Sequence, residues 1–198
     1  MLAGVNGAGK SSVGGAQFRA LGADYFNPDE AARDLLAANP AMTQDDADAA
    51  AWAEGRRLLE RAISEELDFA LETTLGGSTI VRLLGQALER GLEVRVWYVG
   101  LASPELCLQR VAARVAAGGH HVPESRIRAR YHASLLNLID LMPRLTELRV
   151  YDNSAPAPAR GRPAPRLVLH LARGRIEAPA DLGQTPEWAK PIVAAAAT

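Results

Sequence analysis

The residues with the clearest chemistry stand at the start of the chain. Gly4, Gly9, Lys10 and Ser11 fit the spacing G-x-x-x-x-G-K-S, in which backbone N–H groups surround a phosphate chain. Glycines let the backbone turn tightly, and a helix that begins near Lys10 adds its positive end. In this pattern the lysine reaches the β- and γ-phosphates and the serine hydroxyl binds Mg²⁺. The spacing therefore predicts an ATP and Mg²⁺ site with Ser11 as metal ligand and with nucleotide contacts from Gly4, Asn6, Gly7, Ala8, Gly9, Lys10, Ser11 and Ser12.

Lysine is rare in this chain, which makes Lys10 informative. Of the 22 lysines and arginines, only Lys10 and Lys190 are lysines. A compact ammonium fits between a tight loop and a phosphate where a bulky guanidinium does not. A Gly/Ala-rich leader without chemistry is the alternative interpretation, and the retained lysine argues against it.

Asp29 is the candidate general base. It follows a short predicted strand over 23–27, and Asn27-Pro-Asp-Glu30 has the features of a helix start. The carboxyl ends of strands in an open α/β sheet are where ligands bind, so a carboxylate there can face the γ-phosphate. The alternative is that Asp29 only complements the helix dipole, although Glu30 could do this by itself.

A further polar group forms the carboxyl end of the predicted strand 69–74. Glu72, Thr73 and Thr74 could receive a hydroxyl-rich substrate, because a carboxylate accepts from sugar hydroxyls and threonine both donates and accepts. The alternative is an ordinary strand end, in which the threonines only satisfy strand propensity.

Arginines surround a glycine-rich hinge at 118–123. Two predicted helices flank it, and the sequence predicts a lid that closes over the nucleotide and brings guanidinium groups to the phosphates. The alternative is a solvated helical face. The adjacent His120 and His121 indicate a polar lid tip rather than a metal site. The candidate cations are Arg110, Arg114, Arg126, Arg128 and Arg130.

Strands alternate with helices through most of the chain. This order predicts an α/β fold, a P-loop NTPase three-layer sandwich with a mainly parallel sheet of about five strands and helices on both faces. We expect a single domain over 1–198, with a lid at 118–130, a Pro/Ala loop at 155–165 and a C-terminal hairpin at 166–177. A buried apolar strand is predicted at 94–99. Helices are predicted at 11–21, at 43–66, at 78–90 with Ser78 as cap, from Ser103 to a stop at 118–119, and from 123 to about 148 with a bend or break at Pro143. The helix at 43–66 has an apolar stripe that predicts its core face: Trp52, Leu58, Leu59, Ala62 and Ile63.

Composition narrows the classes of partner. The formal net charge of −1 gives no electrostatic reason to expect nucleic acid or a membrane surface. Cys107 is the single cysteine, which excludes an internal disulfide and fits a reducing compartment. With no signal peptide in the sequence, we expect a cytoplasmic protein.

Taken in order, these motifs resemble the zeta-toxin-type P-loop kinases between residue 4 and about residue 153. The shared features are the P-loop, Asn-Pro-Asp-Glu, Leu-Glu-Thr-Thr, and Gly-Gly-His-x-Val-Pro between two Arg-x-x-x-Arg pairs. The toxin branch uses ATP to phosphorylate the sugar of UDP-N-acetylglucosamine. The resemblance implies a catalytic base at Asp29, sugar contacts from Glu72 and Thr74, and lid arginines at Arg114 and Arg130. It also implies a UDP-sugar substrate and an antitoxin protein as partner.

A nucleotide-driven switch or ATPase without a small-molecule acceptor is the alternative function. Asn-Gly-Ala-Gly-Lys-Ser also occurs in ABC-type loops, but the sequence lacks the Leu-Ser-Gly-Gly signature and the apolar strand ending in Asp-Glu that those ATPases need.

Lys10→Ala tests the phosphate cradle. Loss of a charged contact to phosphate predicts ATP binding weaker by about tenfold or more, measured by calorimetric titration. Lys190→Ala is the matched control and keeps wild-type affinity. Unchanged ATP affinity in Lys10→Ala would contradict the cradle.

Overall fold

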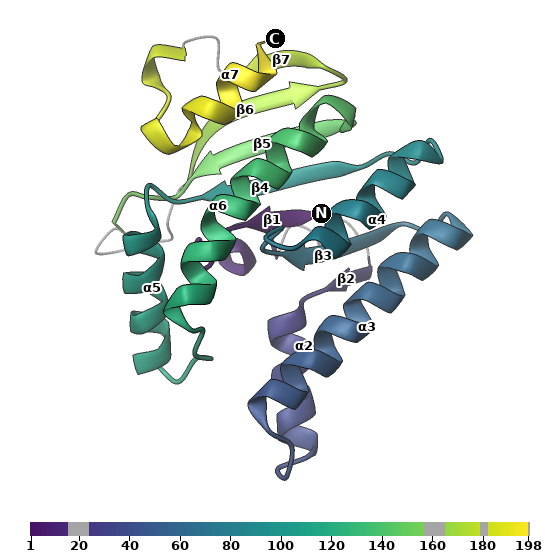
Figure 1. The fold of residues 1–198 in the computed structure, drawn as a ribbon, viewed down its shortest axis with the longest axis vertical. Coiled ribbons are helices and arrows are strands. Elements are labelled where there is room, and N and C mark those ends of the chain that lie inside the picture. Colours follow the sequence, from purple (N-terminus) through teal and green to yellow (C-terminus); the bar gives the residue numbers. More distant parts are fainter. Residues whose placement is uncertain (16–23, 157–164, 179–181, 198) are drawn as a thin grey trace.

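A seven-stranded sheet forms the centre of the computed structural model, which describes residues 1–15, 24–156, 165–178 and 182–197 (Figure 1). The strand order is β2-β3-β1-β4-β5-β6-β7. The first five strands in that order are parallel, and β6 and β7 are antiparallel additions at one edge. The predicted mainly parallel α/β sheet and its C-terminal hairpin are therefore confirmed. The strands are β1 (Leu2–Gly4), β2 (Asp24–Phe26), β3 (Phe69–Thr73), β4 (Arg95–Gly100), β5 (Glu147–Asp152), β6 (Arg166–Ala172) and β7 (Arg175–Ala178).

Helices connect the parallel strands, as the alternating pattern predicts. They are α2 (Pro28–Ala38), α3 (Gln44–Glu65), α4 (Ser78–Glu89), α5 (Pro104–Ala116), α6 (Glu124–Leu141) and α7 (Lys190–Ala196). Short turns of other helical types are η1 (Ser11–Gly15), η2 (Met142–Arg144), η3 (Leu182–Gln184) and η4 (Glu187–Ala189). None of the helices in the described part of the chain is both long and apolar enough to cross a bilayer.

The predicted helix ends are correct in part. Asn27, Thr43 and Ser103 cap α2, α3 and α5 with their side chains. Gly77, not Ser78, precedes α4 as its N-cap. The helix predicted to reach about residue 148 ends at Leu141, because Pro143 cannot continue the hydrogen-bond ladder and a 3₁₀ turn follows. Of the helix predicted over 11–21, the structure describes η1, and 16–21 lie outside the described residues.

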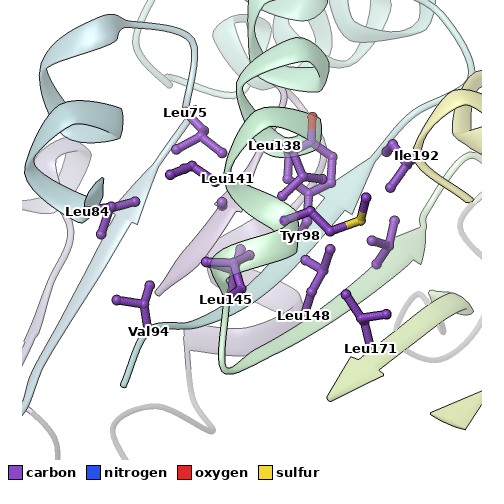
Figure 2. Close-up of a cluster of buried hydrophobic side chains, with 14 of the residues drawn as sticks. Leu75, Leu84, Val94, Tyr98, Leu138, Leu141, Leu145, Leu148, Leu171 and Ile192 are labelled. Atoms are coloured by element: carbon purple, nitrogen blue, oxygen red, sulfur yellow. The ribbon is translucent and has the colours of Figure 1, made fainter. Parts of the chain in front are cut away.

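The larger part of the core lies between the sheet and the helices α3, α4, α6 and α7. Figure 2 shows Leu138 and Leu141 of α6 beside Tyr98 of β4 and Leu148 of β5. A second cluster joins Leu2, Val99 and α5. Both clusters contain residues of β4, since Val96 and Tyr98 belong to the first cluster and Val99 belongs to the second. A strand buried on both faces is the expected result of helices that cover a parallel sheet on two sides.

The predicted core stripe of α3 is wrong at one position. Leu59, Ala62 and Ile63 are buried and Leu58 is half-buried, but Trp52 is 47% exposed. The α3 helix extends beyond the sheet at its N-terminal half, beside α2 (Figure 1). The apolar stripe therefore leaves the core before it reaches Trp52.

Gly100→Ala tests the close packing at the end of β4. A Cβ there would lie 2.1 Å from Cη2 of Trp188, so the ring must move and the free energy of unfolding should fall by about 1–3 kcal/mol. Urea unfolding measures this. Gly85→Ala is the control inside α4, where the nearest atom is 3.7 Å away; it should gain up to about 1 kcal/mol from helix propensity. Equal stability of the two variants would contradict this packing.

Candidate active site

The loop after β1 has the backbone geometry of a phosphate cradle. Gly7 and Gly9 have φ angles of +72° and +77°, values that other residues adopt only with strain. A Cβ at Gly7 would meet the Cβ of Arg110 at 3.1 Å, so α5 packs directly against the loop. The Asn153 side chain donates to the carbonyl of Ala8 at 2.9 Å from beyond the end of β5. The loop is therefore held in shape by its neighbours before any anion binds.

Glu72 joins the phosphate loop to two other strands. Its carboxylate accepts hydrogen bonds from Ser11 Oγ at 2.9 and 3.1 Å and from the Tyr25 hydroxyl at 2.5 Å. Asn27 Nδ2 donates to it at 3.3 Å, and Lys10 Nζ lies 3.9 Å from Oε1. Glu72 is 7% exposed, and burial of a carboxylate is tolerable only with such partners. Glu72 therefore contacts the phosphate loop at Lys10 and Ser11, and it contacts the neighbouring strand β2 and the residue after it at Tyr25 and Asn27.

Asn27 connects this carboxylate to the start of α2. Its Oδ1 accepts from the backbone N–H groups of Asp29 and Glu30 at 3.0 and 3.4 Å, as an N-cap does. Its Nδ2 reaches Ser11 Oγ at 3.3 Å as well as Glu72. One buried side chain thus fixes the position of Asp29 relative to the phosphate loop.

Asp29 faces the arginine-bearing helices across the cavity. Its Oδ2 lies 3.5 Å from Nη1 of Arg114 on α5. The Asp29 side chain is 61% exposed, so this ion pair is weak and can open at small cost.

The threonines at the end of β3, Thr73 and Thr74, keep hydroxyl donors for a ligand. Thr73 Oγ1 accepts from the N–H of Leu75 at 3.0 Å, and Thr74 Oγ1 accepts from the N–H of Gly76 at 3.4 Å. A hydroxyl that accepts from the backbone still has its own proton to donate. Ser134 of α6 donates to the Thr74 carbonyl at 2.6 Å and fixes the turn.

Four of the five candidate arginines reach the cavity. Arg114 also donates to the His120 carbonyl at 3.0 Å, and Arg110 donates to the Ala155 carbonyl at 2.9 Å. Burial lowers the pKa of the Arg130 guanidinium, and the neighbouring Arg126 lowers it further, while Asp29 and Asp48 act in the opposite sense. A bound anion would relieve this repulsion between the two arginines. Arg128 does not line the cavity, because it pairs with Glu105 and Glu124 at 2.6 and 2.8 Å.

A single cavity of about 660 Å³ collects these groups. It lies between the P-loop and the facing helices α2, α3, α5 and α6, which Figure 1 shows at the same end of the sheet. Of the predicted site residues, Gly4 and Ala8 do not line it; they are buried and shape the loop. The predicted residues that do line it are Asn6, Gly7, Gly9, Lys10, Ser11, Ser12, Asp29, Glu72, Thr73, Thr74, Arg110, Arg114, Arg126 and Arg130.

Unpaired polar atoms mark this cavity as a place for a ligand. Among the described residues, four buried side-chain polar atoms have no hydrogen-bond partner, and three belong to residues that line the cavity. These are Asn6 Oδ1, Arg114 Nε and His120 Nδ1. Such atoms are costly unless something else pairs with them.

Mg²⁺ fits the oxygen atoms beside the phosphate loop. Ser11 and Glu72 supply a hydroxyl and a carboxylate, which are ligands that Mg²⁺ prefers. No group of three or more His, Cys, Asp or Glu in the described ranges could hold a metal by itself. Mg²⁺ in such sites takes one or two protein oxygens and completes its shell with phosphate and water.

Sequence reasoning missed several side chains of this site, among them Tyr25 and Asn153, which support the loop, and Asp48 and Trp52, which line the cavity from α3. Asp48 and Trp52 are one turn apart, so a pair of this spacing on a helix that extends past the sheet is the signal that could have revealed them. Tyr25 and Asn153 belong to no sequence motif, because their roles depend on contacts with residues far away in the sequence, Glu72 and Ala8.

Cys107 has a structural place beneath the loop. Its thiol is fully buried, and burial raises the pKa of Cys107 to about 12, although Lys10 and Arg110 act in the opposite sense. The thiol is therefore protonated at neutral pH and packs as a small apolar group.

The fold and this site define a P-loop protein with a kinase-like fold. A family model described as an AAA domain matches residues 1–135, and the chain belongs to that family. An uncharacterized protein of Haemophilus influenzae (strain ATCC 51907 / DSM 11121 / KW20 / Rd) is 34% identical over 135 residues, which are 65% of this chain and 88% of the relative.

Two solved structures share the fold at low sequence identity. The AvrRxo1-ORF1:-ORF2 complex contains a chain with a TM-score of 0.66 and 14% identity, over 98% of this chain and 68% of that one. The PezAT chromosomal toxin-antitoxin system of Streptococcus pneumoniae contains one with a TM-score of 0.52 and 13% identity, over 77% and 67%. At these identities the likeness concerns the fold alone.

Glu72→Gln tests the link between the buried carboxylate and the phosphate loop. The amide keeps the shape but loses the charge that faces Lys10 and Ser11, so Mg²⁺-dependent ATP affinity should fall by about tenfold. Calorimetric titration of ATP with and without Mg²⁺ measures the difference. Tyr25→Phe removes one donor to the same carboxylate and should have the smaller effect. Equal Mg²⁺ dependence in wild type and Glu72→Gln would rule this link out.

Proposed function

We propose that this protein is an ATP-dependent phosphotransferase that transfers the γ-phosphoryl group to the hydroxyl of a small molecule. The observation that carries the proposal is that Asp29 lies in the same cavity as Lys10, opposite Arg114 and Arg130. An acid that faces a phosphate loop across a cavity can orient an acceptor hydroxyl, whereas hydrolysis alone needs no room for an acceptor.

Each residue has a role that its contacts support. Gly7, Gly9 and Lys10 bind the phosphates, and Ser11 with Glu72 holds Mg²⁺. Mg²⁺, when bound, supplies positive charge to the phosphate oxygens. Thr73 and Thr74 donate to the acceptor. Arg114 and Arg130 stabilise the charge on the transferring group.

A second cavity of about 480 Å³ suits the base of the nucleotide. It adjoins the phosphate loop at Gly9 and Ser12, and its walls include the apolar side chains of Val13 and Leu106. Arg110 lines both cavities.

The reaction needs one proton acceptor. The acceptor oxygen forms a bond to the γ-phosphorus, the bond from phosphorus to the β–γ bridging oxygen breaks, and the hydroxyl proton passes to Asp29. ADP leaves with the bridging oxygen. Asp29 pairs with Arg114 in the structure, so a γ-phosphate that attracts Arg114 would free the carboxylate for the hydroxyl.

The resemblance to zeta-toxin-type kinases makes UDP-N-acetylglucosamine the first acceptor to test. PezAT is a chromosomal toxin-antitoxin system, and an antitoxin-like protein partner for this chain is part of the same proposal. The rival function is an ATPase or nucleotide-driven switch. ATP turnover with and without candidate acceptors separates them, because a kinase is stimulated by its substrate and a simple ATPase is not.

Asp29→Asn tests the catalytic base. The amide keeps the size of the side chain but cannot take the proton, so the rate of phosphoryl transfer should fall by about 10²- to 10⁴-fold while ATP affinity stays near wild type. Transfer is followed by mass spectrometry of the acceptor.

Asp34→Asn is the control on the same helix, at an exposed position outside the cavity, and keeps full activity. Transfer at the wild-type rate in Asp29→Asn would remove this residue from the mechanism.

A further inference from the structure

The wall of the cavity that α3 supplies has no role in binding ATP or in the proton transfer. Asp48 and Trp52 lie one turn apart on α3 and both line the cavity. The indole is 47% exposed, although the same stripe of α3 is buried further along at Leu59 and Ile63. An apolar ring in the wall of a polar cavity is a surface on which a ligand ring can stack.

The indole is held from one side. The guanidinium of Arg56 lies over the Trp52 ring at 5.5 Å from its centroid, and Glu60 lies 3.7 Å from Arg56. These residues follow Trp52 at successive turns of α3, so the ring is supported by its own helix. Trp97 with Tyr151 and Tyr98 with Trp188 are ring pairs of the sheet and of the segment that packs on it, and Tyr131 with His132 is a ring pair within α6.

The lid segment faces this wall with polar groups. His120 Nε2 lies 3.4 Å from Asp48 Oδ2, so the loop between α5 and α6 touches α3 across the cavity. His120 Nδ1 is buried and has no partner among the described residues. Asp48 and His120 can therefore take hydroxyl or amide groups from a ring that rests on Trp52.

Arg126 adds an unused positive charge. It lines the cavity from α6, and its guanidinium makes no ion pair or hydrogen bond with any described residue. Arg128, two positions along, is paired with Glu105 and Glu124. An unpaired guanidinium beside Arg130 is a site for a second anion, separate from the phosphates on the P-loop.

From these contacts we infer an acceptor subsite formed by Trp52, Asp48, His120 and Arg126, which takes a polar ring that carries a phosphate. The ring stacks on Trp52, its polar substituents meet Asp48 and His120, and its phosphate binds Arg126. This inference rests on the proposed function, since it assigns the substrate class of that site. It adds Trp52 and Arg126 as residues that select the acceptor.

Binding of defined probes tests the subsite without catalysis. The probes are N-acetylglucosamine, N-acetylglucosamine 1-phosphate, UDP-N-acetylglucosamine, AMP and inorganic phosphate, titrated in the presence of a non-hydrolysable ATP analogue that fills the P-loop. At least one ring phosphate should bind with half-saturation below about 1 mM, and should do so more tightly than N-acetylglucosamine or inorganic phosphate. Failure of every ring phosphate to saturate in this range overturns the subsite.

Variants assign the binding to the named residues. Trp52→Ala and Arg126→Ala should each weaken the ring phosphate by about tenfold, and Arg126→Ala should leave binding of the neutral sugar unchanged. Leu136→Ala, an exposed apolar residue of α6, and Arg128→Ala are the matched controls and should keep wild-type affinity. Ligand-induced change in tryptophan emission should persist in Trp97→Phe and Trp188→Phe and disappear in Trp52→Phe. Wild-type affinity in Trp52→Ala and Arg126→Ala overturns the subsite.

The two proposals fail in different ways. Phosphoryl transfer with an unchanged KM for the acceptor in Trp52→Ala and Arg126→Ala leaves the kinase in place and removes the subsite. Binding of a ring phosphate that depends on Trp52 and Arg126, without any transfer from ATP, leaves the subsite and removes the kinase.

Discussion

The buried carboxylate of Glu72 is the interaction on which the rest of the site depends. Glu72 lies in β3 and meets polar partners from the two strands that flank β3: Ser11 and Lys10 after β1, and Tyr25 and Asn27 within and after β2. The parallel register places Leu2 of β1 beside Glu72, so the phosphate loop and the carboxylate must emerge together. Asn27 then carries the constraint to α2 and to Asp29. Asp29, the proposed base, is thereby linked to the phosphate loop through polar contacts. These contacts are costly to break because they are buried.

The cavity is closed by segments that come from distant parts of the sequence. The helices α2 and α3 approach from one side and α5 with α6 from the other (Figure 1). Two contacts between these sides are polar and partly exposed: the ion pair of Asp29 with Arg114, and the approach of His120 Nε2 to Asp48. Ion pairs of this kind are worth little in water, so the two walls can part and close again around a ligand. The core beneath them is apolar and closely packed, which leaves motion to the cavity walls.

Local signals in the sequence were enough for most of the fold. The P-loop spacing, the caps at Asn27, Thr43 and Ser103 and the apolar strand β4 each depend on neighbouring residues, and each was predictable. Trp52 was not, because its place depends on how far α3 extends past the sheet. Nor was the arrangement of Asn153 against Ala8, since a contact between residues this far apart leaves no pattern along the chain. Sequence motifs therefore identify the residues that could take part in chemistry. The residues that hold them in place, such as Asn153, are identified only by contacts in the folded structure.

The central claim is that the γ-phosphoryl group of ATP passes to an acceptor hydroxyl in the cavity beside Asp29. The most direct measurement incubates the protein with Mg²⁺, ATP and a panel of ring phosphates that includes UDP-N-acetylglucosamine, and follows each acceptor by mass and ADP by chromatography. The account predicts that one acceptor gains a phosphoryl group in equal amount to the ADP formed. Release of inorganic phosphate from ATP at a rate that no acceptor changes would contradict it.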